Sequence, residues 1–121
     1  MTIARKNLGR DGESVAASFL EKNGYTILKR NFAFKGGEID IVAKFEDTVH
    51  FIEVKTRKST DYGTPAMTVN FRKQEKIYKT AEYYLNQKGL IDPPCSFDVI
   101  EVFKFQDGHY AINMIENAFE G

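Results

Sequence analysis

The stretch that decides the fold is GEIDIVAKFEDTVHFIEVKTR, residues 37–57. It contains two extended runs, residues 37–45 and 48–56, and Glu46 and Asp47 form a tight connection between them. Apolar runs of this length, rich in β-branched and aromatic residues and joined by two polar residues, are typical of paired antiparallel strands. We therefore expect a β-hairpin in this part of the chain.

Successive side chains of a strand point to opposite faces, which gathers acidic groups on one face of this hairpin. That face is expected to carry Glu38, Asp40 and Val42 of the first strand, opposite Ile39, Ile41 and Ala43, and Phe51, Glu53 and Lys55 of the second strand, opposite Ile52 and Val54. Asp40 and Glu53 can then face each other. Two carboxylates beside a backbone carbonyl are ligands that Mg²⁺ selects, and Lys55 adds a positive charge for a phosphorane-like transition state. The pattern favours phosphodiester hydrolysis, while a solvated ion pair between strand residues remains the alternative.

The segments around the hairpin complete an α/β pattern. Helical spacing predicts helices over residues 11–23 and 70–88, and extended runs predict further strands. These strands cover residues 25–31, 97–105 and 109–115, and a loop is expected over residues 57–69. The order of one helix, three strands, a helix and two strands predicts a mixed β-sheet flanked by helices. With 121 residues, the chain is expected to form a single domain, 1–121.

Composition excludes several classes of protein. Hydrophobic residues make up 42% and charged residues 28% of the chain, which indicates a globular protein and argues against disorder. Cys95 is the single cysteine, so no internal disulfide can form, and it is expected to be a small buried residue. The N-terminal MTIARKNLGRDGE has no apolar signal region, and no apolar run is long enough to cross a bilayer, so we expect a cytoplasmic protein with no membrane partner.

Charge is divided into blocks, although the net charge is zero. Residues 1–35 carry seven basic residues (Lys or Arg) and three acidic residues (Asp or Glu), and residues 36–54 carry one basic and five acidic residues. Residues 55–79 carry seven basic and two acidic residues, and residues 80–121 carry two basic and seven acidic residues. An acidic block between two basic blocks is the pattern of a cation site flanked by phosphate-binding surface. The alternative is that the blocks only solvate separate surfaces.

Five motifs together resemble a known family. They are GEID at 37–40, FIEVKTR at 51–57, RKQEKIYKTA at 72–81, FDVI at 97–100 and NAF at 117–119. The set resembles the YraN-type UPF0102 family, a branch of the PD-(D/E)xK nuclease superfamily that is similar to archaeal Holliday-junction resolvases. The resemblance implies a restriction-endonuclease-like αβββαβ core plus a C-terminal strand.

The resemblance also implies roles for individual residues. Asp40 and Glu53 would be metal ligands for Mg²⁺ or Mn²⁺, and Lys55 the catalytic lysine. Glu13 would be an outer acid that binds metal through water or orients the nucleophile. Gln74, or Lys73 beside it, would be the polar residue that the second helix places beside the site. For Glu13, an acid favourable to the helix dipole is the alternative explanation.

Three functions follow from these observations. The first is a metal-dependent endonuclease that hydrolyses phosphodiester bonds in branched or single-stranded DNA, and the second is a nucleic-acid-binding module that does not cleave. The third is a protein-interaction domain for which three tyrosines that we expect to be exposed, Tyr62, Tyr78 and Tyr83, would serve as anchors. For the first two we expect phosphate contacts from Arg57, Lys58, Arg72, Lys73 and Lys76, and a homodimer is compatible with either. His50 and His109 are expected to be surface histidines or hydrogen-bonded strand residues without a metal-binding role. A structural role is expected for Asp98, and a place near the nuclease cleft is its alternative.

Overall fold

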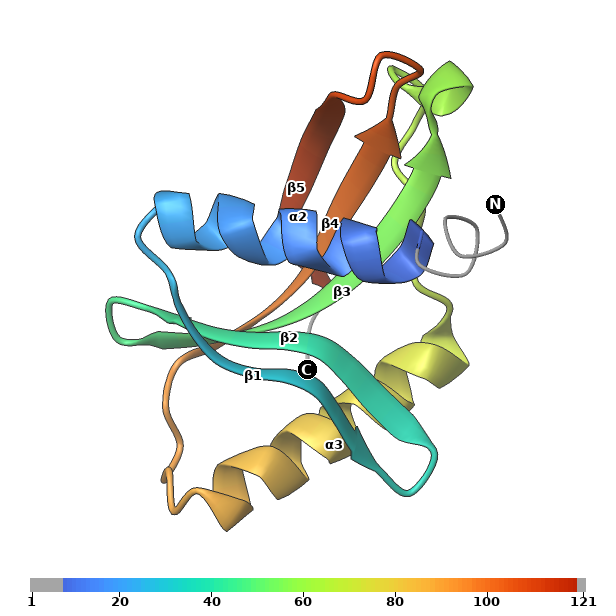
Figure 1. Ribbon diagram of the computed structural model, residues 1–121. Coiled ribbons are helices and arrows are strands. Elements are labelled where there is room, and N and C mark those ends of the chain that lie inside the picture. Colours follow the sequence, from blue (N-terminus) through green and yellow to red (C-terminus); the bar gives the residue numbers. More distant parts are fainter. Residues whose placement is uncertain (1–7, 120–121) are drawn as a thin grey trace.

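One mixed sheet of five strands forms the centre of the molecule, and a helix covers each of its faces (Figure 1). The computed structural model describes residues 8–119, with side chains from residue 11 onward, so Arg5 and Lys6 of the first basic block lie outside the described residues. The elements are α2 (Leu8–Lys22), β1 (Thr26–Phe34), β2 (Gly37–Phe45), β3 (Thr48–Lys58), a short 3-10 helix (Ser59–Asp61), α3 (Phe71–Gln87), β4 (Cys95–Lys104) and β5 (Tyr110–Phe119). This order confirms the restriction-endonuclease-like core with an added C-terminal strand.

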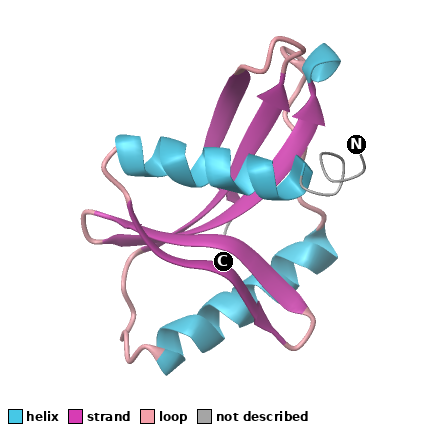
Figure 2. Ribbon diagram, viewed as in Figure 1, coloured by secondary structure: helices cyan, strands magenta, loops and turns pink. Residues whose placement is uncertain are grey.

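The strands lie side by side in chain order, from β1 to β5. All neighbours are antiparallel except β3 and β4, which are parallel and are joined through α3 (Figure 2). A parallel pair needs such a crossover, whereas the antiparallel pairs are closed by short turns. The expected hairpin is present, because β2 and β3 pair from Phe45 opposite Thr48 to Ile41 opposite Ile52.

Each face of the sheet has its own apolar core. On one face α2 buries Ala16 and Leu20 against a cluster of strand residues that consists of Ile41, Ala43, Ile52, Ile100 and Val102. On the other face α3 buries Ile77, Ala81 and Tyr84 against Ile39, Val42, Phe51 and Val99. The two helices therefore fix the sheet from opposite sides. None of the helices within residues 8–119 is long and apolar enough to cross a bilayer.

The strict alternation expected for β2 is interrupted at Asp40. Ile39 and Val42 both belong to the cluster under α3, whereas Ile41 belongs to the cluster under α2. The expectation that Ile39 and Ile41 share a face opposite Val42 is therefore wrong. The physical reason is that β2 pairs with β3 only as far as Ile41, and its first residues pack against α3 instead. Asp40 lies at the point where β2 leaves β3.

Close backbone approach at two glycines holds the helices against this region. A Cβ on Gly37 would lie 2.2 Å from Thr80 Oγ1 and 2.9 Å from the Lys76 carbonyl oxygen, both on α3. A Cβ on Gly12 of α2 would lie 2.3 Å from Thr56 Oγ1 on β3. The backbone oxygen of Lys76 cannot move aside, so glycine is required at Gly37, whereas at Gly12 the one atom under about 3 Å is a side-chain hydroxyl.

The loop expected over residues 57–69 is shorter in the structure, because β3 continues to Lys58 and the 3-10 helix follows. The rest of the loop is held by Glu101 of β4, which accepts hydrogen bonds from the Met67 N–H at 3.0 Å and from Arg57 Nη1 at 2.6 Å. Asn70 then caps α3, since its side chain accepts a bond from the Lys73 N–H. These contacts fix the start of α3 over the middle of the sheet.

Candidate functional site

A cavity of about 300 Å³ lies between the start of β2, the middle of β3 and the first turns of α3. It is lined by Gly36, Gly37, Glu38, Asp40, Glu53, Lys73, Lys76 and Ile77, and we call it the carboxylate cavity. The sequence predicted that Asp40 and Glu53 would meet, and the structure brings them together here. Glu38, which the sequence placed on the acidic face without a role, also lines the cavity.

Asp40 is strongly influenced by its surroundings. Its Oδ2 accepts a hydrogen bond of 2.8 Å from the Val54 N–H, just beyond the last paired residues of β2 and β3. Burial, followed by the negative charge of Glu53, raises the pKa of Asp40 to about 7, and the bond from Val54 opposes the rise. Glu13 and Glu38 add smaller contributions in the same direction. The fold therefore collects negative charge around Asp40, which forms no ion pair with a described residue.

Glu53 is buried and has a cationic partner. Lys73 Nζ lies 2.7 Å from Glu53 Oε1, and the lysine side chain reaches it from the first turn of α3. The resemblance left Gln74 and Lys73 as alternatives for the helix-borne polar residue. In the structure Gln74 Nε2 donates to the Val69 carbonyl oxygen at 2.7 Å, so Gln74 closes the loop before α3, and Lys73 is the residue beside the carboxylates.

Two of the expected catalytic residues, Glu13 and Lys55, do not line the cavity. Glu13 on α2 is close enough to raise the pKa of Asp40, and Arg30 of β1 lies 3.7 Å from its carboxylate. Because α2 begins at Leu8, Glu13 lies beyond the first helical turn, where an interaction with the helix dipole is weak. Lys55 is half-buried, two residues after Glu53 on the same strand, and makes no hydrogen bond or ion pair with the described residues.

The five cations expected to contact phosphate have different surroundings. Arg57 forms an ion pair of 2.6 Å with the buried Glu101, and only 10% of its side chain is exposed. It also donates to Thr64 Oγ1 and to the Pro65 carbonyl oxygen, so its guanidinium is occupied within the fold. The exposed cations Lys58, Arg72 and Lys76 make no ion pair with a described residue. Lys73 is the cation paired with Glu53.

The carboxylates of Asp40 and Glu53 are the groups in this cavity that could bind a divalent cation. Among the described residues no group bonds to Asp40 Oδ1 or to Glu53 Oε2, so each carboxylate keeps one oxygen available. Within residues 8–119, no three His, Cys, Asp or Glu side chains gather closely enough to hold a metal ion by themselves. Mg²⁺ commonly binds through one or two carboxylates and keeps several waters, whereas structural zinc requires four protein ligands. The residues present fit Mg²⁺ or Mn²⁺.

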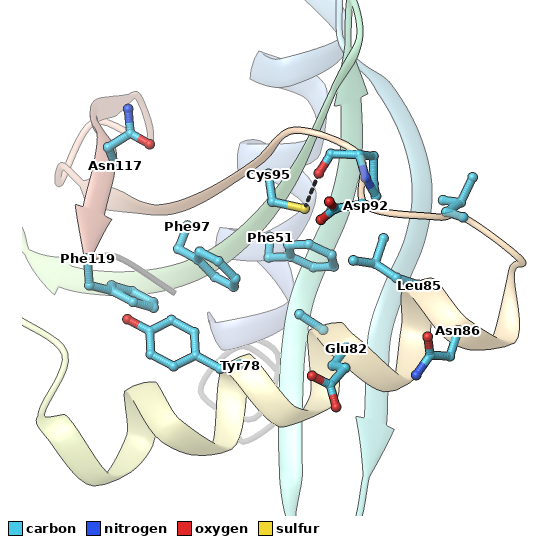
Figure 3. Close-up of a pocket in the computed structure, with 13 residues that line it drawn as sticks. Phe51, Tyr78, Glu82, Leu85, Asn86, Asp92, Cys95, Phe97, Asn117 and Phe119 are labelled. Carbon is cyan, nitrogen blue, oxygen red and sulfur yellow. Dashed lines mark hydrogen bonds between the residues drawn. The ribbon is translucent and has the colours of Figure 1, made fainter.

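A larger cavity of about 790 Å³ lies elsewhere, between α3, β4 and β5 (Figure 3). It is lined mainly by aromatic and aliphatic side chains, and its charged residues, Glu82 and Asp92, are both acidic. Cys95 lies at this cavity and is exposed, so the expectation of a buried cysteine is wrong: its thiol donates to the Pro93 carbonyl oxygen at the strand start. Tyr78 packs edge-on against Phe97 there and is half-buried, which is contrary to the exposed position expected for it.

A separate buried network links the last three strands. Asp98 is fully buried and accepts from Ser96 Oγ at 2.5 Å and from the Asn117 N–H at 3.0 Å. His50 Nδ1 lies 2.6 Å from its other oxygen. The network agrees with the structural roles expected for His50 and Asp98, although no sequence spacing revealed that the two residues are partners. His109 is exposed and contacts Asp107 in a turn.

Comparison with known proteins places the chain in a family. The model of the uncharacterised protein family UPF0102 matches residues 12–102, which include every residue of the carboxylate cavity. A UPF0102 protein of Clostridium acetobutylicum is 50% identical over 116 residues, which are 95% of each chain. UPF0102 proteins of Clostridium botulinum strain 657 and Clostridium tetani are 47% and 46% identical, over 99% of each chain. The chain therefore belongs to the UPF0102 family.

Proposed function

We propose that this protein is a Mg²⁺- or Mn²⁺-dependent endonuclease that hydrolyses DNA phosphodiester bonds at the carboxylate cavity. The observation that carries the proposal is the meeting of Asp40 and Glu53 in one cavity, each with one oxygen that no described residue occupies. Their repulsion in the metal-free protein is the condition that a bound cation relieves.

In this proposal each side chain has a distinct role. Asp40 and Glu53 would hold the cation, which when bound supplies a Lewis acid and lowers the pKa of a coordinated water. Lys55, which has no partner among the described residues, would bind the attacked phosphate and stabilise the charge that develops on it. Lys73 fixes the orientation of Glu53 through their hydrogen bond. Glu13 would orient the attacking water from the side of α2.

The same ion pair supports an alternative function. Lys73 already neutralises Glu53 in the metal-free protein. The cavity therefore requires a bound metal ion less strongly than a cavity with two unpaired carboxylates would. A nucleic-acid-binding module of this fold that does not cleave is the second candidate. In either case DNA is the proposed partner, with Lys58, Arg72 and Lys76 as exposed phosphate contacts. The homodimer and the cytoplasmic location stay predictions.

A cleavage assay separates the two candidates. Single-stranded, duplex and four-way-junction DNA would be incubated with the protein and Mn²⁺, and with EDTA in parallel. The endonuclease proposal expects cleavage that needs Mn²⁺ and is lost in Asp40→Asn. The matched control is Asp47→Asn, which changes an exposed carboxylate in the β2–β3 turn and should cleave like the parent. DNA binding without cleavage of any of the three substrates would support the binding module instead.

A metal titration tests the ligands independently of activity. Calorimetry with Mn²⁺ should show weaker binding in both Asp40→Asn and Glu53→Gln, and unchanged binding in Asp47→Asn. If both cavity variants bound Mn²⁺ like the parent, these residues would be excluded as ligands.

A further inference from the structure

Three aromatic rings stack from the core to the surface beside the carboxylate cavity. Phe34, the last residue of β1, lies face to face with Tyr83 of α3, with 3.7 Å between the ring centroids and 8° between the planes. Phe32 stacks on the same tyrosine at 6.1 Å and 26°. Phe32 is buried, Phe34 is half-buried and Tyr83 is 37% exposed, so the stack ends at the surface.

A flexible side chain also contacts the Phe34 ring. Tyr83 stacks on the ring with 3.7 Å between the centroids, and Lys35 Nζ lies over the ring at 5.3 Å from its centroid. Lys35 is exposed in the β1–β2 turn, and a lysine ammonium can leave a ring at little cost. A flat aromatic group could take its place and extend the stack, with the lysine beside it.

The same side of α3 carries a row of cations. Arg72, Lys76, Lys79 and Tyr83 are spaced at i, i+4, i+7 and i+11, which aligns them along one helix face. All are exposed, and none of the three cations forms an ion pair with a described residue. The two acidic residues of the helix, Glu75 and Glu82, border this row, four residues before and three residues after Lys79. We call this row with Phe34 and Lys35 the stacking stripe.

The stacking stripe is continuous with the carboxylate cavity. Lys76 belongs to both, and the β1–β2 turn contributes Gly36 to the cavity and Lys35 to the stripe. Seven residues of helix separate Lys76 from Tyr83, a distance of about 10 Å along the axis. A strand with stacked bases advances about 3.4 Å per nucleotide, so about three nucleotides would span it.

We infer that the stacking stripe binds single-stranded DNA, with its phosphates along Arg72, Lys76 and Lys79 and an unpaired base stacked on Phe34. A duplex cannot use the ring, because its bases are already stacked and paired, whereas an unpaired base has a free face. The inference rests on the proposed function for the position of the bond to be cleaved. It specifies the substrate as a strand with unpaired bases within a few nucleotides of the cavity.

The test measures DNA binding in EDTA, so that cleavage plays no part. Fluorescence anisotropy would follow a labelled single strand of about 15 nucleotides and the corresponding duplex. Phe34→Leu should weaken single-strand binding about tenfold, the usual size for the loss of one stacked base, and change duplex binding less than about twofold. Phe34→Trp should bind like the parent, because it retains a ring. Lys79→Gln should weaken binding of both DNAs and reduce the salt dependence.

Tyr110→Leu is the matched control. Tyr110 is also a half-buried ring with a lysine over it, Lys104 at 6.0 Å, but it belongs to β5 and packs on the α2 side of the sheet. This variant should bind both DNAs like the parent. Thermal unfolding of every variant identifies any loss of fold.

Three results would overturn the inference: single-strand binding that is unchanged in a folded Phe34→Leu, an equal loss for single strand and duplex, or no single-strand binding by the parent. An equal loss would point to a structural role for the ring. The experiments also distinguish failure of this inference from failure of the proposed nuclease function. If Mn²⁺-dependent cleavage is absent but Phe34→Leu loses single-strand binding, the stripe stands and the nuclease does not. If cleavage is present but Phe34→Leu binds like the parent, the nuclease stands and the stripe does not.

Discussion

Replacing Asp40 by asparagine should make the metal-free protein more stable, and the gain should grow with pH. The pKa of Asp40 rises from 3.8 to about 7 in the folded chain, because the carboxyl is buried and lies near Glu53. In the unfolded chain the group titrates near pH ~4. The pKa of Asp40 is therefore about three pH units higher in the folded state than in the unfolded state. This difference lowers the free energy of unfolding by about 4 kcal/mol once Asp40 is ionised in both states. Asparagine removes the charge and keeps an oxygen for the Val54 N–H.

The pH window follows from the sign of the difference. Because the folded-state pKa is the higher one, the parent is least affected below about pH 4 and loses stability progressively as the pH rises to about 7. The advantage of Asp40→Asn should therefore widen by about 2.5 kcal/mol between about pH 5 and about pH 8. Urea denaturation at unit steps of pH in EDTA measures it, with Asp47→Asn as the exposed control that should show no such trend.

A stability difference that stayed constant across this range would refute the argument, because it would show that Asp40 ionises in the folded protein as easily as in water. Addition of Mn²⁺ at about pH 8 provides a second check. It should stabilise the parent and not the variant, since a ligand stabilises only the folded state that binds it.

Three further substitutions test other parts of the structure. Lys55→Met should keep Mn²⁺ affinity in calorimetry while lowering cleavage about 100-fold, because it removes charge from the transition state and not a ligand; an unchanged rate would assign the activity to another group. Arg57→Gln should lower the free energy of unfolding in urea by about 3 kcal/mol, because the buried Glu101 loses its cation, and a change below about 1 kcal/mol would show that the pair is dispensable. Gly37→Ala should cost about 1 to 3 kcal/mol through overlap with α3. Adding Thr80→Ala should recover only part of this, since the backbone oxygen remains; full recovery would contradict the close approach described.

The sequence predicted the parts of the fold that depend on local pattern. The hairpin strands are recognisable by their composition and by the two polar residues at their turn, and α3 by its apolar period, so the predicted bounds of these elements agree with the structure to within a few residues. The meeting of Asp40 and Glu53 also followed from the hairpin, because the pairing of Ile41 with Ile52 brings the next residue of each strand close together.

The parts that were missed depend on contacts between distant segments. Alternation places Asp40 on a regular strand, but the packing of β2 against α3 breaks that regularity, and nothing local to β2 reveals it. Arg57 is a basic residue of the kind that contacts phosphate, and its sequence neighbours do not reveal that it is buried in an ion pair. Its partner Glu101 lies 44 residues further along the chain. From the sequence alone, either Lys73 or Gln74 could be the helix residue beside the carboxylates. The direction of α3 over the sheet brings Lys73 to Glu53 and turns Gln74 to the Val69 carbonyl oxygen.

The network around Asp98 has a consequence for how the chain acquires its structure during synthesis. Its carboxylate is held by β3, β4 and β5 at once, and the Asn117 N–H comes from the last of these. A nascent chain that has reached only β4 would bury a carboxylate short of one donor and leave Phe97 without Phe119 beside it. Ribosome-bound chains arrested before β5 has emerged should remain open to proteolysis, and release of the final strand should close the sheet in a single cooperative step.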